Sequence, residues 1–282
     1  MVVTGQVPHK TPGAGPHPDD RPRPAAPAPR RRSRWVPPQH GAWAMLLVPF
    51  AAGLLPSWGG RTTWWHLPLL VAWLAGYLLS YYALLAVKTR RPARVRDQLV
   101  CYGAVTLAFG AAVVIARPAL LVLAPAFAVL AAANTWYAAR RRDRAVLNDL
   151  ASVVQACLVT FAVAIVAEVP VRPMIGPAVA CLLYFGGTVL YVKTMIRERG
   201  ERSYQHASTA FHAVALPVAT AVSMWLFVPF TGYVLRAVLL PQRPTTVRPL
   251  SVVQVGMIEV ACSIALLLAL ALPPVGLLPL GL

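Results

Sequence analysis

The sequence carries little charge. Of its 282 residues, 58% are hydrophobic and only 12% are charged, about half the charged share of an average soluble domain. The mean hydropathy is +0.61. This composition excludes a soluble enzyme, a disordered chain and a coiled coil, and it predicts a protein that lies mostly within lipid.

Cysteine is also scarce. Cys101, Cys157, Cys181 and Cys262 all fall inside apolar stretches, and none belongs to a CxxC pair or has a histidine at metal-ligand spacing. We interpret them as small buried hydrophobic residues and expect neither a disulfide framework nor a metal site built on them. Phosphate-loop, dinucleotide-binding and HExxH patterns are absent from the sequence as well, so we expect no resident cofactor.

Acidic residues are few: 9 Asp and Glu stand against 26 Lys and Arg, a formal charge of +17. In a soluble protein this excess would indicate nucleic-acid binding, which needs basic and aromatic residues arranged on a folded domain. Here the basic residues lie in a tail and in short clusters between apolar runs. We therefore expect no nucleic-acid partner, and we attribute the excess to membrane topology.

The first 34 residues are rich in proline and end in the cluster Arg30, Arg31, Arg32 and Arg34. Such a segment has too little apolar surface to offset its ordering entropy. We predict a disordered cytoplasmic tail over residues 1–34 and a transmembrane helical domain over residues 35–282.

Uncharged runs long enough to cross the hydrocarbon core as helices follow the tail. They cover residues 35–60, 62–87, 98–116, 118–139, 150–167 and 173–192. A longer run, residues 203–235, contains Pro229 and predicts two helices, and a last run follows Ser251. The pattern predicts an all-α, polytopic helical bundle with nine transmembrane helices, or eight as the alternative.

The basic clusters favour nine helices and a cytoplasmic N-terminus. With the N-terminus inside, the clusters at 88–96, 140–144 and 193–202 fall on the cytoplasmic side, as the positive-inside rule requires. The outer connections then hold only Arg61, Arg117 and Arg172. With nine spans, Arg243 and Arg248 also lie on the cytoplasmic side, as the rule requires. We expect a multi-pass membrane protein with a cytoplasmic N-terminus, whose partners are membrane lipids.

One carboxylic acid falls within a predicted span. Glu259 lies about two turns into the last span, where a charge is costly unless it is partnered. Its spacing from Gly256 and Ser263 places the three on one helix face, which we expect to look into the bundle. Two interpretations stay open: a proton or cation site, or a protonated acid bonded to its neighbours.

Polar residues also gather where the predicted spans meet the cytoplasm. Asn148 suits a helix N-cap and Asp149 the positive end of the helix dipole, and Asn148, Ser152 and Gln155 form a polar stripe, which a capped helix alone would explain. We predict a cytoplasm-facing pocket, with a single divalent cation as the alternative to no cofactor. Its candidate residues are Gln39, His40, Trp43, Tyr81, Lys88, Tyr137, Asn148, Asp149, Lys193, Arg197, Glu198 and Glu201.

The segment PPQHGAWAMLLVPFAAGLL, residues 37–55, resembles the opening signature of the YwiC-like family of bacterial integral membrane proteins. The resemblance implies membrane location and little chemistry, because the family is uncharacterised.

A more distant resemblance is to the UbiA-type prenyltransferases, at residues 81–92, 137–149 and 191–208. It implies nine helices, a cytoplasmic N-terminus and a cavity that opens to the cytoplasm. The family holds Mg²⁺ on a prenyl diphosphate with two Asp-rich motifs. Here the first motif's place has no carboxylate, and the second has Glu198 and Glu201 among arginines. A related arrangement is therefore expected, and the same reaction is not.

Three functions compete. The first is a prenyltransferase-like protein that binds an anionic or lipid-tailed ligand, with Lys88, Arg91, Lys193 and Arg197 as phosphate partners. The second is a small proton-linked transporter that uses Glu259 and His40. The third is a non-catalytic membrane subunit or assembly factor. The sequence leaves open whether the protein is an enzyme.

The topology is testable by thiol labelling. Cysteines placed at Gly59 and Arg172 should react with impermeant reagents added outside the cell, whereas cysteines at Arg91, Arg142 and Arg199 should not. Outside labelling of the second set would contradict the orientation, and outside labelling at Arg243 would remove the ninth span.

Overall fold

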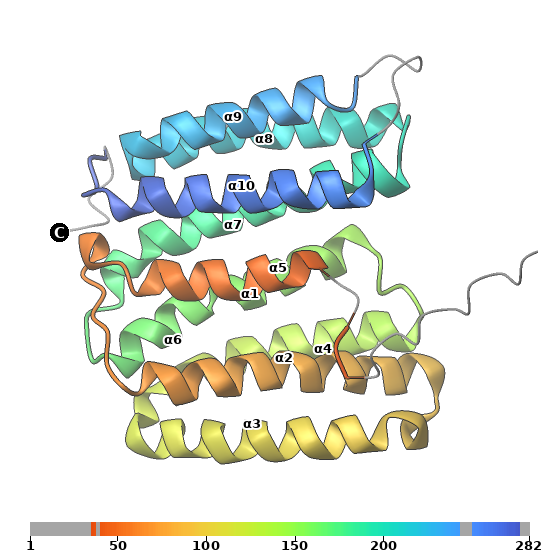
Figure 1. The fold of residues 1–282 in the computed structure, drawn as a ribbon, viewed down its shortest axis with the longest axis vertical. Coiled ribbons are helices and arrows are strands. Elements are labelled where there is room, and N and C mark those ends of the chain that lie inside the picture. Colours follow the sequence, from red (N-terminus) through yellow and green to blue (C-terminus); the bar gives the residue numbers. More distant parts are fainter. Residues whose placement is uncertain (1–34, 38–39, 243–249, 277–282) are drawn as a thin grey trace, which may run out of the picture. The chain divides into compact units, whose positions relative to one another are not determined.

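The computed structural model describes residues 35–37, 40–242 and 250–276, with the backbone alone at position 40. Within these ranges the regular structure is entirely helical. Figure 1 shows helical segments joined by short connections, each antiparallel to the one before it. The α-helices are α1 (His40–Gly53), α2 (His66–Thr89), α3 (Arg96–Ala116), α4 (Ala124–Ala139), α5 (Val146–Cys157), α6 (Val159–Val166), α7 (Ile175–Val192), α8 (Arg202–Val222), α9 (Phe227–Leu239) and α10 (Val252–Ala271).

Short turns of other helix types extend several segments. The 3₁₀ turns are η1 (Pro56–Trp58), η2 (Pro92–Val95), η3 (Pro118–Leu123), η4 (Arg172–Met174) and η6 (Met224–Leu226), and η5 (Lys193–Arg197) is a π turn that continues α7. Proline at the start of a turn fits a position where no backbone N–H is needed. α5 and α6 meet at Leu158 and form one segment.

Six of these segments are long and apolar enough to cross a membrane. They cover His66–Thr89, Pro92–Ala116, Pro118–Ala139, Val146–Val166, Arg172–Arg197 and Val252–Ala271. At about 1.5 Å per residue, each reaches the ~30 Å of a hydrocarbon core. Two further apolar helices are shorter, Gly41–Gly53 and Met224–Leu239. The chain therefore has the helices of a multi-pass membrane protein.

α7 is the central helix. Over half of its apolar stretch is buried, against 6% of the stretches in α3 and α4. Its buried residues include Tyr184 and Phe185, which belong to a core shared with α1, α8, α9 and α10. α3 packs chiefly on α2 and exposes Leu107 and Ile115, as a helix at the lipid boundary would.

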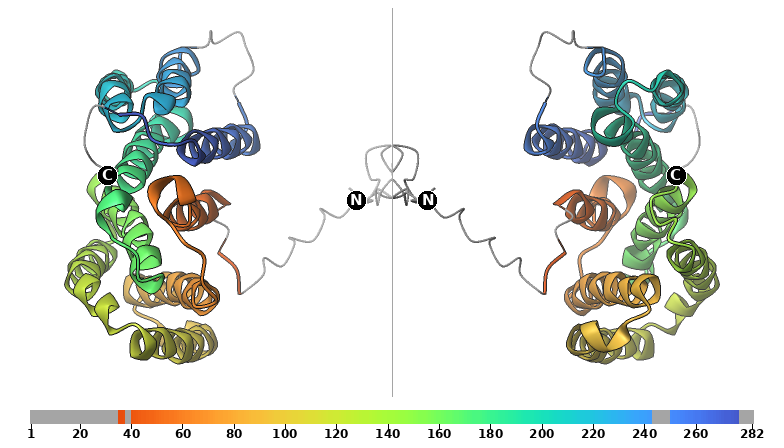
Figure 2. Two further views of the ribbon diagram at one scale, coloured as in Figure 1. Left: turned by 90° about the vertical axis from the view of Figure 1, so that its left-hand side faces the viewer. Right: turned by 90° about the vertical axis from the view of Figure 1, so that its right-hand side faces the viewer.

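α1 and α2 meet through large side chains. The Trp73 indole donates to the Leu46 carbonyl at 3.1 Å, and Trp43 packs edge-on against Tyr77 with ring centroids 6.2 Å apart. Figure 2, which views the helices nearly end-on, shows α1 between α10 and α2. Side chains of both helices, among them Leu46 and Tyr77, line the cavity described below.

Two of the arginines predicted for the outer side cap the C-terminal end of α6. Arg61 donates to the Ala167 carbonyl at 2.7 Å, and Arg117 donates to the Val166 carbonyl at 3.1 Å. Arg117 also pairs with Glu168 at 3.2 Å. Cations at a helix C-terminus offset its dipole and satisfy its last carbonyls. Both arginines therefore have a structural use at an end of the bundle that holds few other charges.

Trp58 closes the same end of the bundle. Its indole donates to the Leu270 carbonyl of α10 at 2.9 Å, the Ser57 hydroxyl donates to the same carbonyl at 2.8 Å, and Trp58 is 2% exposed. The ring lies so close to Gly176 that a Cβ there would come within 2.2 Å of it. The connection after α1 is thus joined to both α7 and α10.

Replacing this tryptophan should therefore weaken the whole bundle. Trp58→Ala is expected to lower the free energy of unfolding by about 3–5 kcal/mol, the usual cost of emptying a buried tryptophan site. Trp64→Ala is the control, because Trp64 is 69% exposed, and its effect should stay within about 0.5 kcal/mol. Unfolding in detergent, followed by near-ultraviolet circular dichroism, measures both; equal losses would contradict this account of the packing.

Candidate functional site

A cavity of about 740 Å³ lies among α1, α2, α4, α5 and the π turn η5. Its lining residues on α2 run from Trp73 to Lys88, a distance of about 22 Å along the helix. The end at Lys88 is the end where α2 meets η2 and α4 meets α5, and there the basic clusters lie (Figure 1). The cavity therefore extends from the predicted cytoplasmic side into the bundle.

Two lysine–aspartate pairs hold the mouth of the cavity together. Lys88 Nζ lies 2.8 Å from Asp143 Oδ2, and Lys193 Nζ lies 2.8 Å from Asp149 Oδ2. Lys193 also donates to the Arg144 carbonyl at 2.7 Å. Lys193 is 6% exposed, so its charge is compensated within the protein.

The first of these pairs keeps Asp143 ionised. Burial alone would raise the pKa of the Asp143 carboxyl, but the hydrogen bond and positive charge of Lys88 outweigh it. The pKa therefore lies below its ordinary value, and the carboxylate is negative at neutral pH. Lys88 and Asp143 together contribute no net charge to the mouth.

Arg144 and Arg197 also line the cavity, from two different segments of the chain. Arg144 belongs to the connection between α4 and α5, and Arg197 ends the π turn η5. Neither guanidinium has an ion pair with a carboxylate of the described residues. The uncompensated charge of the mouth is therefore carried by these two arginines.

A wall of uncharged polar side chains lies beyond the mouth, on α4 and α5. Asn148 Nδ2 donates to the Asp143 carbonyl at 2.9 Å, and the Ser152 hydroxyl donates to the Asn148 carbonyl at 3.1 Å. Asn134 Nδ2 donates to Gln155 Oε1 at 3.1 Å. All four side chains line the cavity. We call Asn134, Asn148, Ser152 and Gln155 the polar wall.

The far end of the cavity is apolar. Leu46, Trp73 and Phe127 line it, and Trp73 packs edge-on against Phe127 with ring centroids 6.1 Å apart. Trp73 and Phe127 lie near the starts of α2 and α4, far from the charged mouth. The cavity thus changes from charged to polar to apolar with depth.

The structure brings some of the twelve candidate residues together around this cavity. Tyr81, Lys88, Asn148, Asp149 and Arg197 line it, and Lys193 contacts Asp149 beside it. The residues that do not line it are Trp43, Tyr137, Glu198 and Glu201. Gln39 and the side chain of His40 lie outside the described part of the chain.

Three details of the sequence reasoning need correction. Asn148 is not an N-cap: α5 begins at Val146 after Ala145, and the Asn148 amide donates instead to the preceding loop. Lys88 and Lys193 do not offer free charges, because each is paired with an aspartate. Arg91 does not line the cavity.

The sequence reasoning missed Asp143, Arg144 and Asn134. Asp143 and Arg144 belong to the basic cluster at 140–144, which the positive-inside rule explains without any binding role. Asn134 is a polar residue within the apolar helix α4. A polar side chain at membrane depth often marks a functional site, and this position could have identified Asn134 from the sequence.

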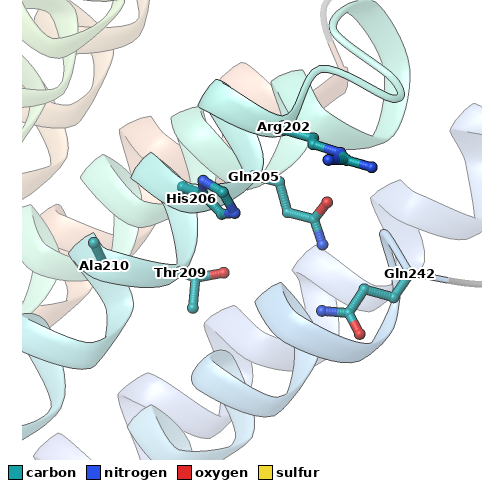
Figure 3. Close-up of a pocket in the computed structure, with 6 residues that line it drawn as sticks. All are labelled: Arg202, Gln205, His206, Thr209, Ala210 and Gln242. Carbon is teal, nitrogen blue, oxygen red and sulfur yellow. The ribbon is translucent and has the colours of Figure 1, made fainter.

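A second hollow of about 610 Å³ lies beside the first turns of α8 (Figure 3). Arg202, Gln205, His206 and Thr209 line it together with Gln242, from beyond α9. Arg202, His206 and Gln242 are exposed, and Gln242 is the last described residue before the gap at 243–249. This hollow lacks the apolar depth of the cavity and has no ion pair at its rim among the described side chains.

Glu259 lies in a separate polar cluster between α7, α9 and α10. One carboxylate oxygen accepts a short bond from Arg236, and the other accepts from Thr188 at 2.9 Å and from Tyr184 at 3.2 Å. The Arg236 side chain is 5% exposed and lies over the ring of Tyr191. Both carboxylate oxygens are thus occupied, which is typical of an ion pair that holds helices together.

The predicted face of α10 is right for Ser263 and wrong for Gly256. Ser263 is buried, and its hydroxyl lies 3.0 Å from that of Tyr184. Gly256 is exposed, with open space where a Cβ would stand. The inward face at that level is formed by Val255 instead, which is 2% exposed.

The described residues contain no group of three or more His, Cys, Asp or Glu side chains placed to hold a metal ion. The two carboxylates at the mouth, Asp143 and Asp149, are each bound to a lysine. The arrangement suits an anion better than a cation.

Comparison with known proteins places the chain in a family. Residues 36–164 match the family model described as YwiC-like protein. The chain is 32% identical to the "Uncharacterized protein YwiC" of Bacillus subtilis (strain 168) over 226 residues, which cover 78% of this chain and 92% of that protein. The chain belongs to the YwiC-like family.

A second relative of this YwiC-like chain is an "Uncharacterized protein" of Haemophilus influenzae. It is 33% identical over 225 residues, which cover 79% of this chain and 91% of the relative. No solved structure matches the chain significantly, so the comparisons give no support to the UbiA-type resemblance. The resemblance to the YwiC-like family is confirmed.

The pair of Arg236 and Glu259 predicts a clear mutational signature. Arg236→Gln or Glu259→Gln alone leaves an unpaired buried group and is expected to lower the free energy of unfolding by about 3–5 kcal/mol. The double variant Arg236→Met with Glu259→Leu should regain most of that loss, because two apolar side chains of similar size need no partner. Chemical denaturation in micelles provides the measurement.

The control is Lys88→Gln. It breaks a pair whose side chains are 36% and 35% exposed, so its effect should not exceed about 1 kcal/mol. If the double variant loses the sum of the single losses, Arg236 and Glu259 do not act as a compensating pair.

Proposed function

We propose that this chain crosses the bacterial cytoplasmic membrane nine times, with its N-terminus inside, and that its cavity binds an anionic ligand with a hydrocarbon tail. The observation that carries the proposal is the gradient along the cavity, from two uncompensated arginines at the mouth to an apolar end about 22 Å deeper. A ligand with one charged end and one apolar end matches this gradient.

The arrangement of segments supports the nine spans. Counting α5 with α6 as one, the described helices form nine antiparallel segments (Figure 1). The connections at 90–95, 140–145 and 198–201 then lie at one end of the bundle and carry the basic clusters. By the positive-inside rule this end faces the cytoplasm. Arg243 and Arg248, which favoured a ninth span in the sequence, lie within residues 243–249, outside the described part of the chain.

Arginine suits an exposed anion site without a metal. A guanidinium stays charged and donates two parallel hydrogen bonds to phosphate or carboxylate oxygens. Arg144 and Arg197 reach the mouth from different segments, so an anion between them would be held from two sides. Lys88 and Lys193 then act on the site indirectly, by neutralising the two aspartates beside it.

The prenyltransferase-like arrangement is part of this proposal. Nine segments and one deep cavity at the basic end support it, and the acidic residues that would hold metal ions in that family are missing from the cavity lining at both motif positions. We propose a binding cavity of that general plan and assign no reaction to it.

Removing the two arginine charges should weaken ligand binding. The double variant Arg144→Gln with Arg197→Gln is expected to lower affinity for a single-chain lipid phosphate by at least about tenfold, since each charged hydrogen bond contributes about 1.5–3 kcal/mol. Native mass spectrometry of the purified protein, titrated with 1-oleoyl lysophosphatidate, measures the bound fraction.

The control variant is Arg142→Gln with Arg202→Gln. It removes the same charge from the same end of the bundle at residues that do not line the cavity, so affinity should stay within about twofold of the parent protein. Equal affinity in both double variants would mean that the lipid binds elsewhere, and it would contradict the proposal.

A further inference from the structure

The order of polarity along the cavity restricts what lies between the charge and the tail of the ligand. The two arginines are at the mouth, the apolar end is deepest, and the polar wall stands between them. From Asn148 to Gln155 the wall extends over about 10 Å of α5. A ligand whose charged group sits between the arginines must pass this wall before its tail reaches Trp73 and Phe127.

The polar wall is uncharged. Amides and a hydroxyl exchange hydrogen bonds with neutral donors and acceptors, such as hydroxyl and ester groups. A second phosphate at this depth would call for a further cation, and no lysine or arginine lines the cavity beyond the mouth among the described residues. The chemistry of the wall therefore fits a neutral, hydrogen-bonding linker.

Part of the wall's hydrogen-bonding capacity is open. Gln155 accepts a bond from Asn134, while its own amide nitrogen has no partner among the described side chains and backbone. The Ser152 hydroxyl reaches Asn134 Oδ1 only at 3.5 Å, the limit of a hydrogen bond. A ligand hydroxyl beside Gln155 and Asn134 could accept from the Gln155 amide and donate to Asn134 Oδ1, and an ester oxygen could accept from Gln155.

Prenyl phosphates and acylglycerol phosphates differ at this point. In a prenyl phosphate the hydrocarbon begins directly at the phosphate ester oxygen, so carbon would cover the wall and strip water from its amides without replacing the hydrogen bonds, which is costly. In an acylglycerol phosphate a hydroxyl and an ester lie between phosphate and tail. The second class places hydrogen-bonding groups where the wall has them.

We propose that the ligand class is an acylglycerol phosphate, and that Ser152 and Gln155 select it over a prenyl phosphate. The proposal rests on the lipid-binding function above and specifies the class of ligand that is bound. It assigns the arginines to the phosphate, the polar wall to the glycerol ester, and Leu46, Trp73 and Phe127 to the acyl chain.

The test compares two ligands that share a phosphate monoester and a single tail, 1-oleoyl lysophosphatidate and farnesyl phosphate. Native mass spectrometry of the full chain should show affinity for lysophosphatidate higher by on the order of tenfold, the effect of one or two hydrogen bonds. The variant Ser152→Ala with Gln155→Leu should bring the ratio of the two affinities close to one.

The matched control is Ser80→Ala. Ser80 lines the cavity from α2 and is not part of the polar wall, which lies on α4 and α5, so the preference should remain. A thermal unfolding curve for each variant confirms that it is folded. Free glycerol 3-phosphate, added as a competitor at equal concentration, should fail to displace lysophosphatidate, because it lacks the tail.

The outcomes separate this inference from the function it rests on. If both ligands bind equally and both depend on Arg144 and Arg197, the selection by the polar wall is wrong and lipid binding stands. If neither depends on the arginines, lipid binding in this cavity is wrong. Displacement by glycerol 3-phosphate would identify a soluble phosphate as the ligand and would overturn the assignment of the acyl chain.

Discussion

Hydrocarbon offers no hydrogen bonds, so a polar group at membrane depth must find its partner within the protein. Most polar side chains of this bundle follow that constraint. Arg236 donates to Glu259 between α9 and α10, and Tyr184 and Thr188 complete the carboxylate. The rest of the guanidinium lies against the rings of Tyr191 and Tyr233. The His66 ring bonds to the Val163 carbonyl at 3.0 Å. Such groups join helices and have little capacity left for a ligand.

The cavity is a place where polar side chains keep open hydrogen-bonding groups. Gln155 keeps an open amide, and among the described residues Asn148 Oδ1 is buried without a hydrogen-bond partner. Arg144 and Arg197 are exposed at the mouth and have no ion pair with a described carboxylate. Keeping open polar groups beside apolar ones costs stability, and a protein that only had to fold would fill the space with apolar side chains. Open groups that line a cavity are therefore a physical sign of a ligand.

The sequence predicts the helical segments well and the partners poorly. Uncharged runs and basic clusters locate the membrane-length helices, because length and charge are local properties. The pairing of Lys193 with Asp149 depends on how α5 and α7 approach each other, and that of Arg236 with Glu259 on the packing of α9 and α10. Residue spacing alone also placed Gly256 inward, whereas the actual rotation of α10 turns Val255 inward.

The end of α7 connects the two polar regions of the bundle. Tyr191 and Lys193 are two residues apart, about 200° around a helix, and they face opposite neighbours: Tyr191 lies under Arg236, while Lys193 reaches Asp149 at the cavity. The π turn follows at Lys193–Arg197 and brings Arg197 to the mouth. π turns are rare in proteins overall, but those that occur are often found at functional sites. α7 thus packs against the Arg236–Glu259 ion pair through Tyr184 and Tyr191, and its continuation, the π turn, carries Arg197 to the ligand cavity. The packing of α7 against that ion pair therefore helps to fix the position of Arg197 at the mouth.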